Sequence, residues 1–262
     1  MTAPLVWADI DRDVVVVEGD DAAVFLHSQL AQDISGLQVG HSVHSLLLEP
    51  TGHVHSVVRV VRHGDTLFTL DVDAPYGETL IARLQRFVLR SKVTLRTSDW
   101  VVRAFRGDNA VAEVGPGTDR AVVAWGAPDA VDVVAAPGDL PVHGEKTEPE
   151  HIDMIRVDHE WPRLGVDILV GDIPATTGIV RAAVSFTKGC YPGQELVERM
   201  DSRGAGAPVN IRVIDRDGVG VGSRVEASPH DTGTVTSIGF SRALVRVGRS
   251  SAIGREPGLQ TE

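Results

Sequence analysis

Three short apolar segments joined by tight turns constrain the fold of this 262-residue chain more than any other feature of its sequence. They occupy residues 43–49, 53–62 and 66–72, and they are separated by a Pro-Thr-Gly turn and a His-Gly-Asp turn. Connections this short join neighbouring strands and cannot hold a parallel crossover. The sequence therefore predicts an antiparallel meander of three strands.

Strand and helix patterns follow one another irregularly along the rest of the chain. Further strands are predicted at 14–17, 92–97, 101–105, 121–125 and 131–135, and helices at 21–31, 75–89, 147–156 and in the second half of 188–200. This mixture favours an α+β fold over a regularly alternating α/β fold. Four short segments near the end, 209–214, 223–226, 233–240 and 243–247, predict a small β-barrel, because closure would remove their unpaired edges.

The segment Asp201–Pro208 has the composition of a linker. We therefore expect one domain over residues 1–205 and a small C-terminal barrel over 206–248. Residues 249–262 have little apolar content and are expected to form a flexible tail.

Charge and cysteine content exclude several classes of protein. The net charge of -11 argues against a protein that coats nucleic acid. The single cysteine, Cys190, excludes an internal disulfide and an iron–sulfur cluster held by four thiolates of one chain. His53 and His55 have no clear third partner, so no metal site is expected. The sequence shows no signal peptide and no membrane-spanning run, which makes a cytoplasmic protein the expectation.

The segment 188–195, Lys-Gly-Cys-Tyr-Pro-Gly-Gln-Glu, has the most chemical character. Its two glycines indicate a sharp turn, and a helix beginning near residue 192 would place Cys190 just before unpaired N–H groups. Those groups and nearby Lys188 would favour the thiolate. The alternative is that a lone cysteine is a small buried apolar residue.

This segment resembles the K-G-C-[FY]-x-G-Q-E signature of the YgfZ family, folate-binding proteins related to the glycine-cleavage T-protein, an aminomethyltransferase. Similar stretches occur in the same order elsewhere. They are Val17–Asp33, Leu46–His53, Arg156–Asp167 and Gly233–Gly239, which resemble the family's N-terminal helix, first hairpin, pterin-side loop and barrel strand. The resemblance covers most of residues 14–247.

The resemblance implies a fold of two interleaved α+β lobes and a small C-terminal barrel around a central channel. It implies tetrahydrofolate, or a one-carbon derivative, as the cofactor. It also implies a role in assembling or repairing iron–sulfur enzymes, including those that thiolate tRNA. The expected partners are folate and iron–sulfur client enzymes, with no direct nucleic acid and no membrane. In this family the protein is not regarded as a cluster scaffold, which agrees with its single cysteine.

The resemblance to the aminomethyltransferases is incomplete at their catalytic acid. Their Asn-Ala pair corresponds to Asp73-Ala74 here, and the catalytic Asp, six residues after the Ala, corresponds to Leu80. An apolar side chain cannot hydrogen-bond a folate nitrogen. The carboxylates Asp71, Asp73 and Glu78 lie near in sequence, and a shifted register would restore one. The alternative is that Asp71 and Asp73 end a strand and face water.

The family likeness also assigns folate contacts. Asp158 corresponds to the acid that binds the aminopyrimidine edge of the pterin, a charge-assisted contact. Arg181 and Arg199, like Arg163, are candidates for the anionic glutamyl tail. The alternatives are a solvated loop aspartate and ordinary surface arginines.

Within the motif, the resemblance assigns Cys190 and Lys188 as catalytic residues. Gly189, Tyr191, Gly193, Gln194 and Glu195 are assigned as the loop that supports them. Gln194 and Glu195 also suit the first turn of any helix.

Three functions follow from these assignments. The first is a folate-dependent accessory protein with Cys190 as its functional thiol. The second is a folate-dependent aminomethyltransferase or demethylase, against which Leu80 argues, so that enzymatic activity is left open between one-carbon and thiol chemistry. The third is a binding module whose cysteine is structural.

Overall fold

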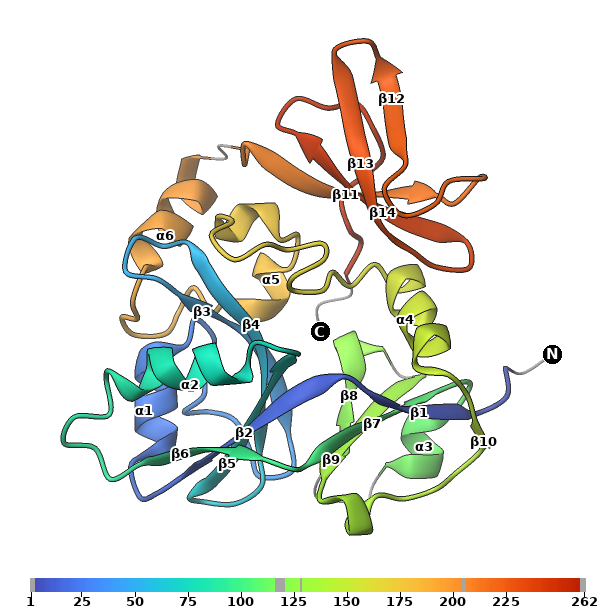
Figure 1. Ribbon diagram of the computed structural model, residues 1–262. Coiled ribbons are helices and arrows are strands. Elements are labelled where there is room, and N and C mark those ends of the chain that lie inside the picture. Colours follow the sequence, from blue (N-terminus) through green and yellow to red (C-terminus); the bar gives the residue numbers. More distant parts are fainter. Residues whose placement is uncertain (1–2, 116–120, 128, 204–205, 260–262) are drawn as a thin grey trace.

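The computed structural model describes residues 3–115, 121–127, 129–203 and 206–259. The chain forms three sheets with helices between and around them (Figure 1). The mixture of helices and sheets confirms the predicted α+β class.

The first sheet contains the predicted meander and has the order β3-β4-β5-β2-β6. Its strands are β2 (Arg12–Glu18), β3 (Ser42–Leu48), β4 (Val54–Arg62), β5 (Leu67–Asp73) and β6 (Thr94–Ser98). All neighbours are antiparallel, as the short turns predict. The helices α1 (Ala22–Gln29), α2 (Gly77–Gln85) and α5 (Val180–Ala183) pack with this sheet around the largest apolar core.

The second sheet has the order β10-β1-β7-β9-β8. Its strands are β1 (Val6–Ile10), β7 (Val101–Arg106), β8 (Ala121–Val123), β9 (Ala130–Ala135) and β10 (Glu145–Lys146). Short helical segments follow or flank these strands: α3 (Ala110–Val114), η1 (Ala124–Gly126) and η2 (Pro137–Asp139). The predicted strand 121–125 therefore ends at Val123 and continues as the turn η1.

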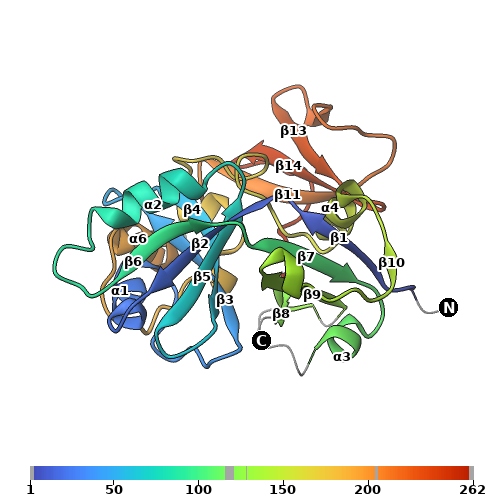
Figure 2. The ribbon, with the colours of Figure 1, turned by 60° about the horizontal axis from the view of Figure 1, so that its bottom comes forward.

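Two nearly continuous extended segments join these sheets. The chain passes from β1 to β2 with one residue between them, and from β6 to β7 with two. Figure 2 shows the two sheets side by side, with the β1–β2 and β6–β7 segments running from one sheet to the other. Each sheet therefore contains one strand from each of these two segments, which is the interleaving that the family resemblance implies.

The C-terminal strands form a third, four-stranded antiparallel sheet rather than the predicted closed barrel. Its order is β11-β14-β13-β12, from β11 (Val209–Asp215), β12 (Arg224–Ser228), β13 (Asp231–Ile238) and β14 (Arg242–Gly248). In the described part of the chain, β11 and β12 do not pair with each other. The edge of β11 is instead covered by a bridge between Val213 and Arg255, so closure is not needed to protect it.

The segment after β14, expected to be a flexible tail, makes specific contacts over its described residues. The Ile253 side chain is buried in the core of the C-terminal sheet. The Arg255 guanidinium pairs with Glu160, and the amide of Gly258 donates to the same carboxylate, at 2.5 Å. Residues 260–262, and residues 204–205 of the predicted linker, lie outside the described part of the chain.

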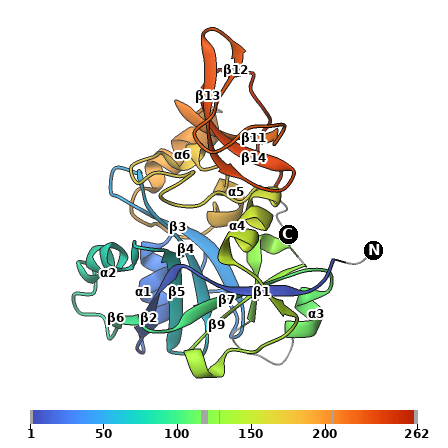
Figure 3. The same cartoon turned by 45° about the vertical axis from the view of Figure 1, so that its right-hand side comes forward.

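Helix α4 (Pro149–Asp158) lies between the second and third sheets (Figure 3). A long irregular segment follows it and contains η3 (Pro174–Thr176), and α6 (Gln194–Arg203) precedes the C-terminal sheet. No helix among the described residues is long and apolar enough to cross a membrane.

Candidate functional site

The central feature of the molecule is a cavity of about 620 Å³ where the three sheets meet. Its walls come from the β1–β2 junction, β3, β4, β7, β9, α4, the segment after α4, and β13. A volume of this size is typical of sites for small molecules and cofactors.

A chain of buried ion pairs forms one wall of this cavity. Arg59 on β4 lies opposite Asp71 on β5, and its Nε is 2.8 Å from the Asp71 carboxylate. Arg12 at the start of β2 pairs with the same aspartate. Arg59 also reaches across to Asp132 on β9, at 2.5 Å, and Asp132 in turn accepts from Arg106 on β7, at 2.7 Å. The two interleaved sheets are thus joined through buried charges.

The ion pairs determine the protonation states along this wall. Burial alone would raise the pKa of Asp132, but Arg106 and Arg59 outweigh burial and lower it to about 2. Arg59 and Arg12 likewise hold the pKa of Asp71 below its usual value. Both carboxylates are therefore anionic at neutral pH, and each is paired with two arginines.

Asp73, a predicted folate contact, lines the cavity at the end of β5. Its carboxylate pairs with Arg12 at 2.9 Å and accepts from the amide of Leu164 at 3.2 Å. Burial raises the pKa of Asp73 despite these partners. Asp71 is fully buried between arginines, and its pKa is lowered. Asp73 faces the cavity, and its pKa is raised, so it accepts a proton more readily than Asp71.

Leu80 lies on α2, its side chain is buried in the largest apolar core, and it does not line the cavity. The structure therefore gives position 80 no contact with a ligand there. Asp73 is the carboxylate of this part of the sequence that lies at the cavity.

Arg106 has an unusual environment for a buried guanidinium. Only 1% of the residue is exposed. Its Nη1 donates to Asp132 and to the carbonyl oxygens of Phe105 and Val131, at 2.7, 2.8 and 3.2 Å. Its Nε and Nη2 have no hydrogen-bond partner within the described structure. The ring of Trp125 covers the guanidinium, with 4.2 Å from Cζ to the ring centroid, and both residues line the cavity.

A second polar group lies on the α4 side of the cavity. Arg156 pairs with Asp153 at 2.8 Å and with Asp167 at 3.0 Å. Asp167 also accepts from the hydroxyl of Ser237 on β13, at 2.7 Å. Asp153 additionally pairs with Arg163 at 3.2 Å, so the predicted tail-binding candidate Arg163 does reach the cavity.

Two aromatic rings complete the lining near β3. The ring of His44 packs against Trp161, with 4.3 Å between centroids. Desolvation, together with the charge of Arg59, lowers the pKa of His44 to about 3. His44 is therefore a neutral ring at physiological pH.

Asp158, the predicted pterin ligand, does not line the cavity. Its carboxylate accepts from the backbone amides of Phe240, Ser241 and Arg242, each at 3.0 Å. This contact fastens the end of α4 to the β13–β14 turn. A side chain at Gly239 would collide with the Asp158 carboxylate, which accounts for glycine there.

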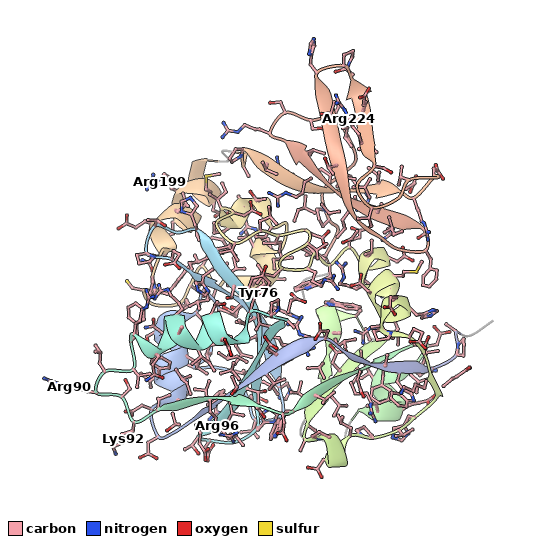
Figure 4. The ribbon with its side chains drawn as sticks, in the orientation of Figure 1. Tyr76, Arg90, Lys92, Arg96, Arg199 and Arg224 are labelled. Carbon is pink, nitrogen blue, oxygen red and sulfur yellow. The ribbon has the colours of Figure 1, made fainter. Side chains whose placement is uncertain are left out.

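Arg181 and Arg199, the predicted contacts of the glutamyl tail, also lie away from the cavity. The Arg181 side chain is 71% exposed, pairs with Asp201 at 2.7 Å and borders a separate hollow of about 280 Å³. Arg199 lies on α6 at the periphery of the molecule (Figure 4), beside a hollow of about 390 Å³. The structure does not bring either residue together with Asp73.

Lys188 of the cysteine motif binds the C-terminal end of α1. Its ammonium donates to the carbonyl oxygens of His27, Leu30 and Gln32, the last two at 2.5 and 3.3 Å. Burial lowers the pKa of Lys188 to about 8, although carbonyls at a helix C-terminus favour a cation. Lys188 therefore holds the motif against the C-terminal end of α1.

The rest of the motif forms a tight loop before α6. The Gln194 side chain accepts from the amide of Tyr191 at 3.0 Å, and burial raises the pKa of the Tyr191 phenol to about 12. Gly193 has φ +83°, and a Cβ there would lie 2.5 Å from the carbonyl oxygen of Glu49. Gly193 therefore permits close contact with the β3–β4 turn. Gly189 faces open space, and Glu195 lies in the first turn of α6.

Cys190 is exposed, and its sulfur lies 3.6 Å from the Gln194 amide nitrogen. Its exposure excludes the reading of a small buried apolar residue. No residue from 188 to 195 lines the central cavity. The molecule therefore has two separate candidate sites, the cavity and the exposed thiol.

Several cavity residues were not anticipated from the sequence. They are Arg12, His44, Arg59, Arg106, Trp125, Asp132, Asp153, Arg156 and Trp161. A usable signal existed for two of them, because Arg59 interrupts a run of four valines and Asp132 interrupts a strand that is otherwise apolar. A charge inside such a strand indicates a buried partner. Among the described residues, no group of three or more His, Cys, Asp or Glu side chains is placed to hold a metal ion.

Comparison with known proteins defines the class of fold. No family model matches the chain. The crystal structure of the glycine cleavage system aminomethyltransferase T from Bartonella henselae superposes with a TM-score of 0.78, over 94% of this chain and 79% of that one, at 19% identity. The chain therefore has the T-protein fold.

Relatives identified by sequence similarity carry more specific names than the structural neighbour. The chain is 27% identical over 219 residues to the tRNA-modifying protein YgfZ of Escherichia coli O157:H7, covering 74% of this chain and 67% of that protein. It is 28% identical over 218 residues to the mitochondrial iron–sulfur cluster assembly factor IBA57 homolog of Neurospora crassa. That match covers 74% of this chain and 49% of the relative. The chain thus spans about half the IBA57 homolog and about two thirds of YgfZ.

An uncharacterized protein of Haemophilus influenzae is 25% identical over 232 residues, covering 86% of this chain and 80% of that protein. Together these relatives confirm the resemblance to YgfZ that the motifs predict.

Proposed function

We propose that this protein binds tetrahydrofolate, or a one-carbon derivative of it, and supports iron–sulfur cluster assembly or repair, including in enzymes that thiolate tRNA. The names of its YgfZ and IBA57 relatives and its T-protein fold support this proposal. The observation that carries the folate part is the cavity where the three sheets meet, because its size and lining suit a reduced folate.

The chemistry of the lining fits the parts of a folate. The aminopyrimidine edge of a pterin donates hydrogen bonds, for which Asp73 and Asp153 are acceptors at the cavity. The opposite edge and the glutamyl tail present acceptors, and the unpartnered nitrogens of Arg106 are donors. Trp125 and Trp161 provide flat apolar surfaces against which rings can stack. When bound, the folate would supply one-carbon chemistry.

The second part of the proposal concerns the thiol. Cys190 is exposed and outside the cavity, so we assign it to contact with the surface of a client enzyme rather than with the folate. Lys188 would hold the loop in place through α1. A single thiol per chain acts on clusters held by another protein. We expect this to occur in the cytoplasm without direct RNA contact, because a net charge of -11 opposes phosphate.

A second candidate function, folate-dependent transfer of an aminomethyl or methyl group, is favoured by one observation. Asp73 lies at the cavity with a raised pKa, which suits a group that exchanges a proton with a ligand. Formation of methylene-tetrahydrofolate from an aminomethyl donor by the purified protein, lost in Asp73→Asn, would establish it. A complete absence of turnover with binding intact would leave the accessory role.

Folate binding is tested by anaerobic calorimetry with tetrahydrofolate. We expect wild type to bind and Asp73→Asn to bind at least about 10-fold more weakly, because a charge-assisted hydrogen bond contributes about 1.5–3 kcal/mol. Asp65→Asn is the matched control, since that side chain is 94% exposed and remote from the cavity lining. Wild type that binds no tetrahydrofolate would refute the folate proposal.

The client role is tested in cells that lack the chromosomal copy of this gene. Wild type, Cys190→Ala and Asp65→Asn are expressed at equal levels, and the thiolated nucleosides of tRNA are measured by mass spectrometry. Restoration by wild type and Asp65→Asn, but not by Cys190→Ala, is expected. Full restoration by Cys190→Ala would refute the thiol role.

A further inference from the structure

The guanidinium of Arg106 has one complete hydrogen-bonding edge that no atom of the described residues uses. Every hydrogen bond it makes leaves from Nη1, toward Asp132 and two backbone carbonyls. Its Nε and Nη2 are buried and unpartnered in the described structure. These two nitrogens form the side of the guanidinium from which two parallel N–H groups point, the arrangement that binds two acceptors at once.

An unused edge of this kind is costly for a folded protein. A buried donor without a partner loses its hydration, at about 1–3 kcal/mol or more for a charged group. An incoming group with acceptor atoms would therefore satisfy the two unused N–H donors of Arg106.

Trp125 covers the face of the same guanidinium. Its backbone has φ 56°, a left-handed conformation that is uncommon for a bulky residue and costs energy to maintain. This conformation places the indole over Arg106, at 4.2 Å from Cζ to the ring centroid, beside the cavity. The donors and the flat apolar surface together define a slot for a flat group.

We propose that Arg106 and Trp125 form a subsite that takes a flat ligand group carrying two adjacent hydrogen-bond acceptors. This inference rests on the proposed folate function. A reduced folate presents such a pair in each carboxylate of its glutamyl tail.

The chain contains a matched control for Arg106. Arg103 lies on the same strand, its guanidinium stacks on Trp7 at 4.1 Å, and it pairs with Asp9 at 2.7 Å. Arg103 does not line the cavity. Replacing either arginine with lysine keeps the charge and removes the paired donors, so the two variants differ only in which site is altered.

The experiment measures anaerobic binding of tetrahydrofolate, tetrahydropterin and 4-aminobenzoylglutamate to wild type, Arg106→Lys and Arg103→Lys. We expect Arg106→Lys to lose about 10- to 100-fold in affinity for tetrahydrofolate and for one fragment, while Arg103→Lys stays within about twofold of wild type. 4-Aminobenzoylglutamate is the fragment expected to bind more weakly, because it carries the carboxylates, and loss of affinity for tetrahydropterin alone would contradict a carboxylate ligand. Equal affinities of Arg106→Lys and wild type for all three compounds would overturn the subsite.

A second variant decides the outcome if Arg106→Lys does not fold. Trp125→Ala leaves the ion pairs of Arg106 intact and should weaken binding of the same fragment, and unchanged binding would overturn the inference. Wild type that binds no tetrahydrofolate would refute the proposed function instead. Benzoate, which carries the same acceptor pair, then tests the subsite by quenching tryptophan fluorescence in wild type but not in Trp125→Phe, and absence of that difference would overturn it.

Discussion

The central cavity and the loop that carries Cys190 hold their charged groups in different ways. In the cavity, arginines and aspartates from strands of two sheets pair with one another and are almost fully buried. In the loop, Lys188 binds backbone carbonyls at the end of one helix, and the thiol beside it is exposed. The cavity therefore depends on the assembly of the whole fold, whereas the loop depends on local contacts with the end of α1 and with the β3–β4 turn.

Removing the central carboxylate of the cavity should have the largest effect. Asp132→Ala leaves Arg59 and Arg106 buried without their shared anion, and breaking a buried pair in this way costs about 3–5 kcal/mol. Urea unfolding measures the loss. The control Asp65→Ala removes a side chain that is 94% exposed and lies 3.5 Å from Arg62, and it should change stability by less than about 1 kcal/mol. Equal losses in both variants would contradict the comparison.

The neutral His44 predicts a pH dependence of stability that arises at the cavity. Its folded pKa of about 3 lies below the unfolded value of 6.5, so the unfolded chain binds more protons between these limits. Wild type should lose stability as the pH falls from 6.5 toward 3. His44→Phe keeps a ring against Trp161 but removes the titrating group. The slope of its stability against pH should therefore be smaller than that of wild type by up to one bound proton. Parallel unfolding curves over that range would show that His44 is not held neutral.

Loss of the loop's anchor should have a smaller effect. Lys188→Met leaves carbonyls at the end of α1 without their donor, which costs about 1–3 kcal/mol. Lys92→Met is the control, because that ammonium and its partner Asp20 are both more than two thirds exposed. Chemical denaturation compares the two. If Lys188→Met has the same free energy of unfolding as wild type, the loop is held by other contacts.

The thiol itself should contribute least to stability. Cys190→Ser should stay within about 0.5 kcal/mol of wild type, because an exposed side chain buries little. A thiol reagent should modify folded wild type at a rate close to that of the unfolded chain. Slow modification, or a large loss of stability in Cys190→Ser, would show that the cysteine is structural.

Local features of the fold could be predicted from the sequence. The meander follows from its turns, and most helices begin and end within a few residues of the predicted positions. The barrel was wrong because the edge of β11 is covered by residues far along the chain, near Arg255, which no local pattern reveals.

The candidate site was less accessible from sequence for the same reason. Asp73 was identified because its position next to a strand end matched a family motif, and it does line the cavity. Asp158 matched a motif equally well, but its partners are amides more than 80 residues away. Arg59, Asp132 and Arg106 acquire their meaning only when two sheets meet, although charges within apolar strands gave a warning.

One hairpin connects the two regions. The turn between β3 and β4 packs against Gly193, close to Cys190, while His44 on β3 and Arg59 on β4 face the cavity. A β-strand has a fixed rise per residue, and inserting a single residue would turn every later side chain to the opposite face. The distance between the thiol and the cavity is therefore set by the number of residues along this hairpin.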